Sequence, residues 1–349
     1  MGWWRVDADT LAGGRFVTSP LAEALAGLKT LHRGSASHVG EHRWLAAHLA
    51  DYRDRLAGDP VTAALVGAAL GRRWNATFLT PTPLGDGEPT FAEELEQVRG
   101  TPAAVVRADL AESLDRSLPD LLRRDDLAPR AADLLEWVWT ETVQDTWPRR
   151  RRIIEADILA RTARLGLHGW ATTLDDMRPG MRWLGEDRLQ ITGFDSPPLE
   201  LSGVQLMFVP VTLNQSWVCW DAPPVDARSM LPARRMLAAR RMLAARRFAV
   251  VYPCSGVLVD DDRRPVPKAL AALLGPARAE ILALLDTPKT TTQLVALTGL
   301  PLGSVGRHLR ILREARLTQR RRAGRSVLYC RTTTGRTLVD AQLSEPGAH

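Results

Sequence analysis

Cysteine and lysine are both scarce in this chain of 349 residues. The three cysteines, Cys219, Cys254 and Cys330, are far apart and odd in number, which argues against a disulfide framework and against a thiolate metal site. Lysine accounts for three of the 46 basic residues, so nearly all of the positive charge is arginine. Because this bias runs through the whole chain, arginine content alone is weak evidence for a binding site.

Long apolar runs and common catalytic motifs are also missing. No apolar stretch approaches the roughly 20 residues that a membrane helix needs, and the N-terminus MGWWRVDADT lacks the features of a secretory signal. Neither of the nucleotide-binding patterns GxGxxG and GxxxxGKS/T occurs, and the nucleophile elbow GxSxG is absent. We therefore expect a cytoplasmic protein that is not an enzyme, with no catalytic residues, no cofactor and no membrane contact.

Four histidines between residues 32 and 48 come nearest to a metal site. His38 and His42 are four residues apart, a spacing that lets two imidazoles on one helix share a zinc ion. No HExxH pattern accompanies them. We expect capping, stacking or solvated histidines and no metal site.

The positive charge of the chain is concentrated near its C-terminus. From Lys268 to His349 there are 13 basic and 5 acidic residues, whereas the preceding residues hold 33 basic and 35 acidic ones. The last quarter therefore carries a balance of +8 and the rest a balance of −2. A basic segment of this kind predicts an acidic partner such as nucleic acid.

The front of the chain changes character near residue 170. The stretch FVTSPLAEALAGLKTL has helical periodicity, with Ser19 as N-cap and Pro20 at the first helical position. Further on, MRWL, DRLQITGF, VQLMFVPVTL, SWVCW and FAVVYP have the pattern of strands and predict a small antiparallel sheet. The length favours two domains. We predict an N-terminal domain over 1–260, helical over 1–170 and strand-rich over 180–260.

The region 266–340 shows a specific order of elements. PKALAALLGPARAEILALLD predicts two short helices joined at Gly275-Pro276, and TTTQLVALTGL predicts a helix closed by Gly299. A longer helix follows in PLGSVGRHLRILREAR, and LTQRRRAGRSVLYCRT predicts a hairpin around Ala323-Gly324. This order is typical of a winged helix-turn-helix domain, whose second helix enters the major groove of DNA. The fold class is therefore α+β, with double-stranded DNA as partner and an expected association with the nucleoid.

The longer helix, predicted over 302–315, carries two different faces. Val305, Leu309 and Leu312 form an apolar stripe, and Gly303, Arg307 and Arg310 lie on the opposite side. Arg307 can reach the O6 and N7 atoms of a guanine, and glycines allow the backbone close to the bases. The hairpin over 317–331 is an arginine-rich wing for the DNA backbone or minor groove. The predicted DNA-binding residues are Leu302, Gly303, Ser304, Gly306, Arg307, Arg310, Arg321, Arg322 and Arg325.

An arginine repeat is the most conspicuous feature of the front domain. The unit ARRMLA occurs at 233–238 and again at 239–244, within an arginine-rich insertion at 232–247. On a helix, a step of six residues turns the arginine pair by about 240°, so successive pairs would point to different sides. We interpret the insertion as a solvated connection between strands. A supplementary contact with DNA or an acidic partner is the alternative.

The segments RAEILALL, TQLVALTGL, SVGRHLRILREARL and GRSVLY resemble the ArsR-type winged-helix regulators. This resemblance implies a homodimer that binds an inverted-repeat operator and acts as a repressor. It also implies a dimer interface built around Lys268–Leu274 and Gly335–Ala341. Metal-sensing members carry cysteines in the helix that corresponds to TTTQLVALTGL, which has none here. We therefore expect a regulator that does not sense a metal.

The front domain has a resemblance of its own. FVTSPLAEALAGL, FLTPTPLGDGEPTFAEELEQVRGTP and DTWPRRRRIIEAD are similar to the long N-terminal domain of some actinobacterial ArsR-type regulators. This likeness implies one regulator whose front domain serves as a sensor or interaction domain for a small-molecule or protein effector. The eleven tryptophans pack a core or line an aromatic ligand pocket. The alternative function is an enzyme or interaction scaffold that the C-terminal domain localises to DNA.

Overall fold

The computed structural model describes residues 2–37, 39–71, 75–84, 87–114, 116–175, 177–192, 198–221, 245–254, 266, 268–285, 288–323 and 326–343. The chain divides into two compact units. One comprises Met1–Trp147 with Arg161–Val257, and the other comprises Pro148–Ala160 with Leu258–His349.

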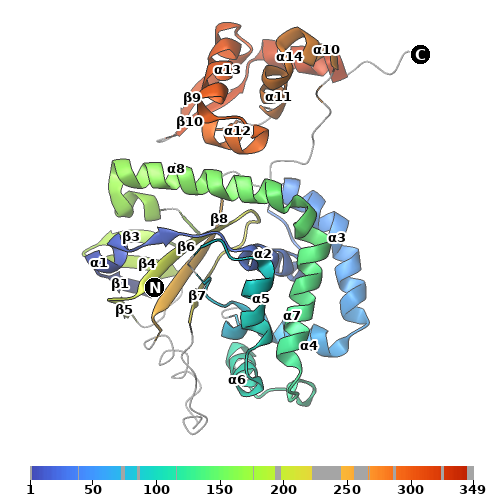
Figure 1. Ribbon diagram of the computed structural model, residues 1–349, viewed down its shortest axis with the longest axis vertical. Coiled ribbons are helices and arrows are strands. Elements are labelled where there is room, and N and C mark those ends of the chain that lie inside the picture. Colours follow the sequence, from blue (N-terminus) through green and yellow to red (C-terminus); the bar gives the residue numbers. More distant parts are fainter. Residues whose placement is uncertain are drawn as a thin grey trace. The chain divides into compact units, whose positions relative to one another are not determined.

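Helices make up most of the first 175 residues (Figure 1). Their bounds are α1 (Ala8–Ala12), α2 (Pro20–Arg33), α3 (Val39–Ala57), α4 (Pro60–Ala69), α5 (Phe91–Arg99), α6 (Ala103–Leu114), α7 (Leu127–Val138) and α8 (Trp147–Leu174). A π-helical turn, Trp139–Val143, follows α7. Helix α8 bends at Gly169, where the backbone has φ 73° and ψ 176°.

Helix α2 is the central helix of the first unit, since every residue from Pro20 to Leu28 is buried. It begins where the sequence predicts, because the Ser19 hydroxyl accepts the backbone N–H of Ala22 at 3.0 Å. The buried carboxylate of Glu23 accepts the backbone N–H of Thr212 at 2.8 Å. Helix α2 is thereby tied to the sheet that it covers.

The described strands of the first unit form two four-stranded sheets, in the orders β3-β4-β1-β5 and β2-β6-β8-β7. Their bounds are β1 (Gly2–Val6), β2 (Arg15–Phe16), β3 (Arg182–Gly185), β4 (Arg188–Thr192), β5 (Leu199–Leu201), β6 (Gln205–Val211), β7 (Trp217–Trp220) and β8 (Arg247–Pro253). Strand β1 pairs antiparallel with β4 and parallel with β5. Strand β6 pairs parallel with β2 and β8, and β7 pairs antiparallel with β8.

The α+β class is confirmed, but the single antiparallel sheet expected in 180–260 is wrong in two respects. Strands β1 and β2 come from the N-terminus, within the region expected to be mostly helical. The central pair of the second sheet, β6 and β8, is parallel. Both central strands are almost completely buried, and continuous apolar runs such as QLMFVPV are typical of strands that are covered on both faces.

The aromatic side chains of the two sheets share one core. Trp4 of β1 meets Phe248 of β8 edge-on at 5.6 Å between ring centroids, and Trp170 of α8 lies 5.2 Å from Phe208 of β6. Tyr252 is fully buried in the same cluster. These tryptophans therefore serve in packing, which is one of the two roles expected for them.

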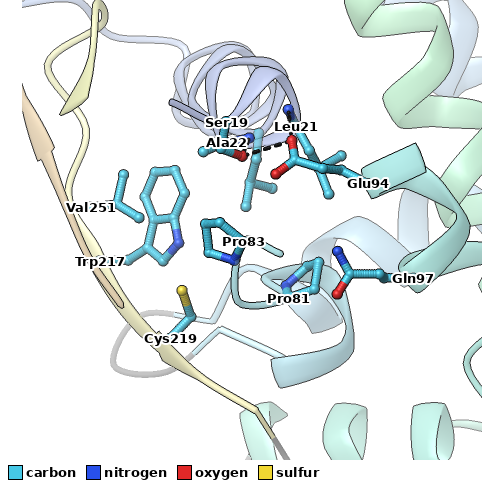
Figure 2. Close-up of a pocket in the computed structure, with 11 residues that line it drawn as sticks. Ser19, Leu21, Ala22, Pro81, Pro83, Glu94, Gln97, Trp217, Cys219 and Val251 are labelled. Carbon is cyan, nitrogen blue, oxygen red and sulfur yellow. Dashed lines mark hydrogen bonds between the residues drawn. The ribbon is translucent and has the colours of Figure 1, made fainter. Parts of the chain in front are cut away.

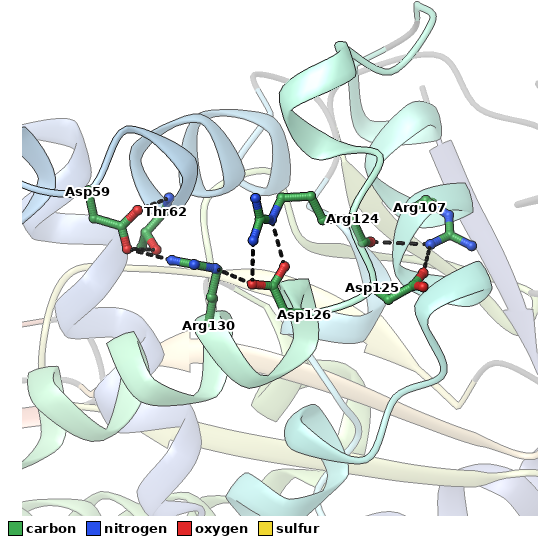
Figure 3. A network of polar contacts seen from close by, with 7 residues as sticks. All are labelled: Asp59, Thr62, Arg107, Arg124, Asp125, Asp126 and Arg130. Atoms are coloured by element: carbon green, nitrogen blue, oxygen red, sulfur yellow. Dashed lines mark hydrogen bonds and ion pairs between the residues drawn. The ribbon is translucent and has the colours of Figure 1, made fainter.

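A polar network holds the start of α4 to the start of α7 (Figure 3). The Asp59 carboxylate caps α4 by accepting the N–H of Thr62 at 3.1 Å, and it pairs with Arg130 at 2.9 Å. Arg130 also donates to Asp126, which accepts two further bonds from Arg124. The hydrogen bonds from Arg124 and Arg130 hold the pKa of Asp126 well below its usual range.

The second unit contains a helical bundle followed by a hairpin and a last helix. Its bounds are α10 (Lys268–Leu274), α11 (Pro276–Leu284), α12 (Thr291–Thr298), α13 (Leu302–Glu314), β9 (Thr318–Ala323), β10 (Ser326–Arg331) and α14 (Thr333–Leu343). The joint at Gly275-Pro276 and the end of α12 at Gly299 lie where the sequence predicts them. The arginine insertion at 232–247 lies outside the described residues up to 244, and Arg247 begins β8.

The second unit has no room for a side chain at Gly335, in the first turn of α14. A Cβ atom at this position would overlap the carbonyl oxygen of Leu317, the residue that precedes β9. The same carbonyl accepts the N–H of Thr332 at 3.0 Å, so it is not free to move away.

We expect Gly335→Ala to destabilise the second unit by about 1–3 kcal/mol, the usual cost of overpacking. Hydrogen exchange of the full chain, read by mass spectrometry, should become faster in α14 and in the hairpin. Thr334→Ala, at an exposed position in the same turn, is the matched control. Unchanged exchange in Gly335→Ala would contradict the close approach.

Candidate functional site

Helix α13 is held at a defined angle by its neighbours in the second unit. Helix α12 begins with a reciprocal capping box between Thr290 and Gln293 and ends at Gly299 in the left-handed conformation, with φ 71°. The chain then turns through Pro301 into α13. Two helices joined by so short a turn form a helix-turn-helix.

The two faces of α13 differ as the sequence predicts. Val305, Leu309 and Leu312 are at most 1% exposed and belong to the core of the unit. Arg307 and Arg310 are exposed on the opposite side of the helix. Arg310 lies 3.9 Å from the Glu314 carboxylate, and both side chains are about two-thirds exposed, so this pair restrains Arg310 weakly.

The two glycines of α13 have no packing role within the described residues. A Cβ atom at Gly303 or Gly306 would meet nothing within 4 Å. Glycine costs about 1 kcal/mol relative to alanine inside a helix, so these positions carry a cost that the fold of the unit does not require. Glycine would be needed at both positions if another molecule came close to the backbone on this face of α13.

The first turn of α13 has no side-chain cap. Pro301 has no side-chain acceptor, and its carbonyl oxygen accepts the N–H of Ser304 at 2.9 Å and that of Val305 at 3.1 Å. Leu302 is 53% exposed and Ser304 is half-buried. Helix N-termini of this kind attract anions, because the helix dipole and the amides add together.

The hairpin of β9 and β10 forms a basic wing directly after α13. In its register Arg320 lies opposite Tyr329, and Arg321 lies opposite Leu328. Arg320 and Arg321 are exposed. Arg322 belongs to β9, but its side chain lies outside the described residues, as does the whole of Arg325.

Two contacts that sequence reasoning missed anchor the wing. Lys289, before α12, exchanges two backbone hydrogen bonds with Tyr329, at 2.9 and 2.8 Å. Arg331 donates from Nε to the carbonyl of Leu282 at 2.7 Å, and its Nη2 donates to the carbonyl of Ala283. Arg331 thus caps the C-terminal end of α11. The sequence does not indicate this role, because Arg331 is one of many arginines and lies at the end of a strand.

The structure therefore brings most of the predicted residues to one face of α13. Leu302, Gly303, Gly306, Arg307 and Arg310 are all exposed on this helix. Ser304 lies at its first turn, and Arg321 lies on the adjoining wing. Helices α11, α12 and α13, followed by the two-stranded wing, define a winged helix-turn-helix domain.

Comparison with known proteins agrees with this fold. Residues 275–319 match the family described as "Bacterial regulatory protein, arsR family". The C-terminal part of the chain therefore carries an ArsR-type helix-turn-helix, the DNA-binding domain of a transcription regulator. No curated protein and no solved structure shows significant similarity to the chain.

Two further features concern ions and membranes. Within the described ranges, no group of three His, Cys, Asp or Glu side chains is arranged to hold a metal ion. Among the same residues, none of the helices combines the length and the apolar character that crossing a membrane requires.

A small cavity in the first unit lies between α2, α5 and β7 (Figure 2). Its volume is about 10 Å³, which is room for about one water molecule and too little for an organic effector. Glu94 of α5 lines it, and one carboxylate oxygen accepts the Ser19 hydroxyl and the N–H of Leu21, both at 2.9 Å. The other carboxylate oxygen is buried, and no described residue forms a hydrogen bond with it.

Burial raises the pKa of Glu94 to about 7, against the two hydrogen bonds, which lower it. A carboxyl whose pKa is higher in the folded state stabilises the fold fully below its ordinary pKa of 4.5 and loses this contribution as pH rises through 7. Stability should therefore fall between about pH 5 and pH 8.

We expect Glu94→Gln to remove this fall, because glutamine keeps the shape and cannot ionise. At pH 8 the variant should exceed the wild type in free energy of unfolding by up to about 3 kcal/mol. Urea unfolding followed by tryptophan fluorescence at several pH values measures the difference. Glu96→Gln, which is exposed on the same helix, is the control. A variant that follows the wild-type pH profile would show that Glu94 is ionised throughout.

Proposed function

We propose that the chain is a transcriptional repressor of ArsR type, in which α13 enters the major groove of an operator. The observation that carries this proposal is the exposed face of α13, where Arg307 and Arg310 stand beside two glycines that no packing contact requires. Arg307 would bind the O6 and N7 atoms of a guanine, the commonest specific contact in the major groove. Leu302 would contact a thymine methyl group.

The wing would bind the DNA backbone or the minor groove next to this contact. Arg321, Arg322 and Arg325 belong to the hairpin that follows α13. Narrow minor grooves attract arginine because their negative potential is high. Anchoring by Lys289 and Arg331 supports this role, since a hairpin tied to α11 and α12 would present its arginines at a fixed distance from α13.

The regulator would act as a homodimer on an inverted-repeat operator. Helices α10 and α14 pack against each other in the second unit, and Leu273 of α10 is 69% exposed. An exposed leucine on the expected interface supports burial against a second copy. Helix α12 carries no cysteine, and this supports a mode of regulation without the thiolate metal site of the metal-sensing relatives.

The first unit would serve as the sensor or interaction domain, and the chain would be a regulator and not an enzyme. The family match supports this assignment, because it falls on a DNA-binding domain. The alternative is a catalytic or scaffolding front unit that the C-terminal domain localises to DNA.

Binding of the full chain to DNA from upstream of its own gene, measured by fluorescence anisotropy over a salt series, tests the proposal. Arg307→Ala should weaken specific binding by about 1–3 kcal/mol and reduce the preference over unrelated DNA. Arg321→Ala should weaken both DNAs equally and lower the salt slope by about 1. Arg123→Ala, an exposed arginine of the first unit, is the control. Equal specific affinity of Arg307→Ala and wild type would remove α13 from the proposal.

The glycines give a second test, in which stability and binding should change in opposite directions. Gly303→Ala and Gly306→Ala should each raise the free energy of unfolding by about 0.5–1 kcal/mol, because the new methyl group meets nothing in the protein. Each should weaken DNA binding, because the methyl group would meet the groove. Gly67→Ala in α4, an equally open helical position, should stabilise without changing DNA affinity. Stabilised variants that bind DNA as well as the wild type would show that the glycines do not face the bases.

A further inference from the structure

The first unit contains a second, much larger cavity of about 600 Å³. It is lined by Arg161 of α8, the turn Met177–Arg182, Gln190 of β4, Asn214 and Pro253. All of these residues belong to the first unit. Sites for small organic molecules have volumes of about 300–1,000 Å³, so this cavity has the size of a ligand site.

Arg178 is the unusual residue of this cavity. Its Nε and Nη1 atoms are buried and have no hydrogen-bond partner among the described residues. Burial lowers the pKa of the guanidinium to about 10, so it stays charged at neutral pH. Buried cations in proteins are normally paired, because an uncompensated charge in a low dielectric costs several kcal/mol. Among the described residues, no carboxylate offsets this charge.

The surroundings of Arg178 are also positive. Burial lowers the pKa of Lys29 to about 8, and the charges of Arg33 and Arg178 lower it further. Arg161 is 7% exposed, and its guanidinium lies 4.4 Å from the centroid of the Tyr252 ring. Its position over the ring fixes a second cation at the cavity wall.

The remaining polar groups at the wall suit an anion as well. Arg182 of β3 and Gln190 of β4 are opposite each other in the register of the sheet, and both line the cavity. Asn214 contributes an amide side chain. Its backbone N–H donates to Glu41 at 3.0 Å, and the other oxygen of this carboxylate accepts the N–H of Ser37 at 2.6 Å. The described wall contains no acidic residue.

We propose that this cavity binds a small organic anion, whose carboxylate or phosphate group pairs with the guanidinium of Arg178. The planar fork of arginine donates two parallel bonds to such oxyanions. Arg161 and Arg182 complete the neutralisation, and the amides of Gln190 and Asn214 bind the uncharged part of the ligand. The proposal does not depend on DNA binding, because every residue that carries it lies in the first unit.

Isothermal titration calorimetry of the full chain at constant ionic strength tests the site. The probes are inorganic phosphate and citrate, with glucose as the neutral control and sodium chloride as the background. Saturable binding of phosphate, of citrate or of both is expected, and the stronger of the two identifies the anionic group that the site prefers. Glucose should not bind. No binding of either anion above the chloride background would overturn the proposal.

Arg178→Met provides the decisive variant, because it should change stability and binding in opposite senses. Removal of an unpaired buried charge should raise the Tm of the ligand-free protein, and anion affinity should fall at least tenfold. Arg178→Lys, which keeps the charge without the fork, should bind with intermediate affinity. Arg123→Met, at an exposed position, should change neither property.

Three results would contradict the assignment. Anion affinity of Arg178→Met within twofold of wild type would place the anion elsewhere. A lower Tm of ligand-free Arg178→Met would show that the guanidinium already has a stabilising partner in the fold. A DNA affinity that falls in Arg178→Met, with no anion binding by the wild type, would assign the residue to DNA instead and would also overturn the proposal.

Discussion

The burial of Val305, Leu309 and Leu312 determines which side chains of α13 the second unit exposes to solvent. Side chains on a helix repeat every 3.6 residues, so placing this stripe in the core turns Gly303, Arg307 and Arg310 outward together. The core partners on α11 and α12 set the axis of α13. The carbonyl of Leu317, fixed by Thr332 and by the close approach of Gly335, sets where the wing begins. The orientation of the basic face is thus a consequence of packing.

Much of the second unit could be predicted because its signals are local. Caps at Thr290 and Gly299, the Gly275-Pro276 joint and the apolar stripe of α13 all act within a few residues. The two sheets of the first unit could not be predicted in the same way. Strand β1 pairs with strands about 190 residues away in sequence, and nothing in GWWRV identifies those partners. Its aromatic and β-branched residues did indicate a strand, which the helical interpretation of 1–170 overlooked.

The arginines of this chain have different structural roles that the amino-acid composition does not reveal. Arg130 and Arg124 form ion pairs with Asp59 and Asp126, and Arg331 caps a helix. Arg307 is exposed, and the Nε and Nη1 atoms of Arg178 are buried without a hydrogen-bond partner among the described residues. These environments arise from tertiary packing, so the sequence gives five similar residues with four different roles. Most of the arginine-rich insertion at 232–247 lies outside the described residues, so its role stays a prediction.

In the proposed function, α13 recognises an operator through the major groove. Methylation interference with dimethyl sulfate tests it directly, because the reagent modifies guanine N7 in the major groove and adenine N3 in the minor groove. If α13 lies in the major groove, methylation of guanine N7 at symmetric positions of the operator should prevent binding of the full chain, because Arg307 would occupy this site. Interference confined to adenine N3, or none at any base, would contradict it.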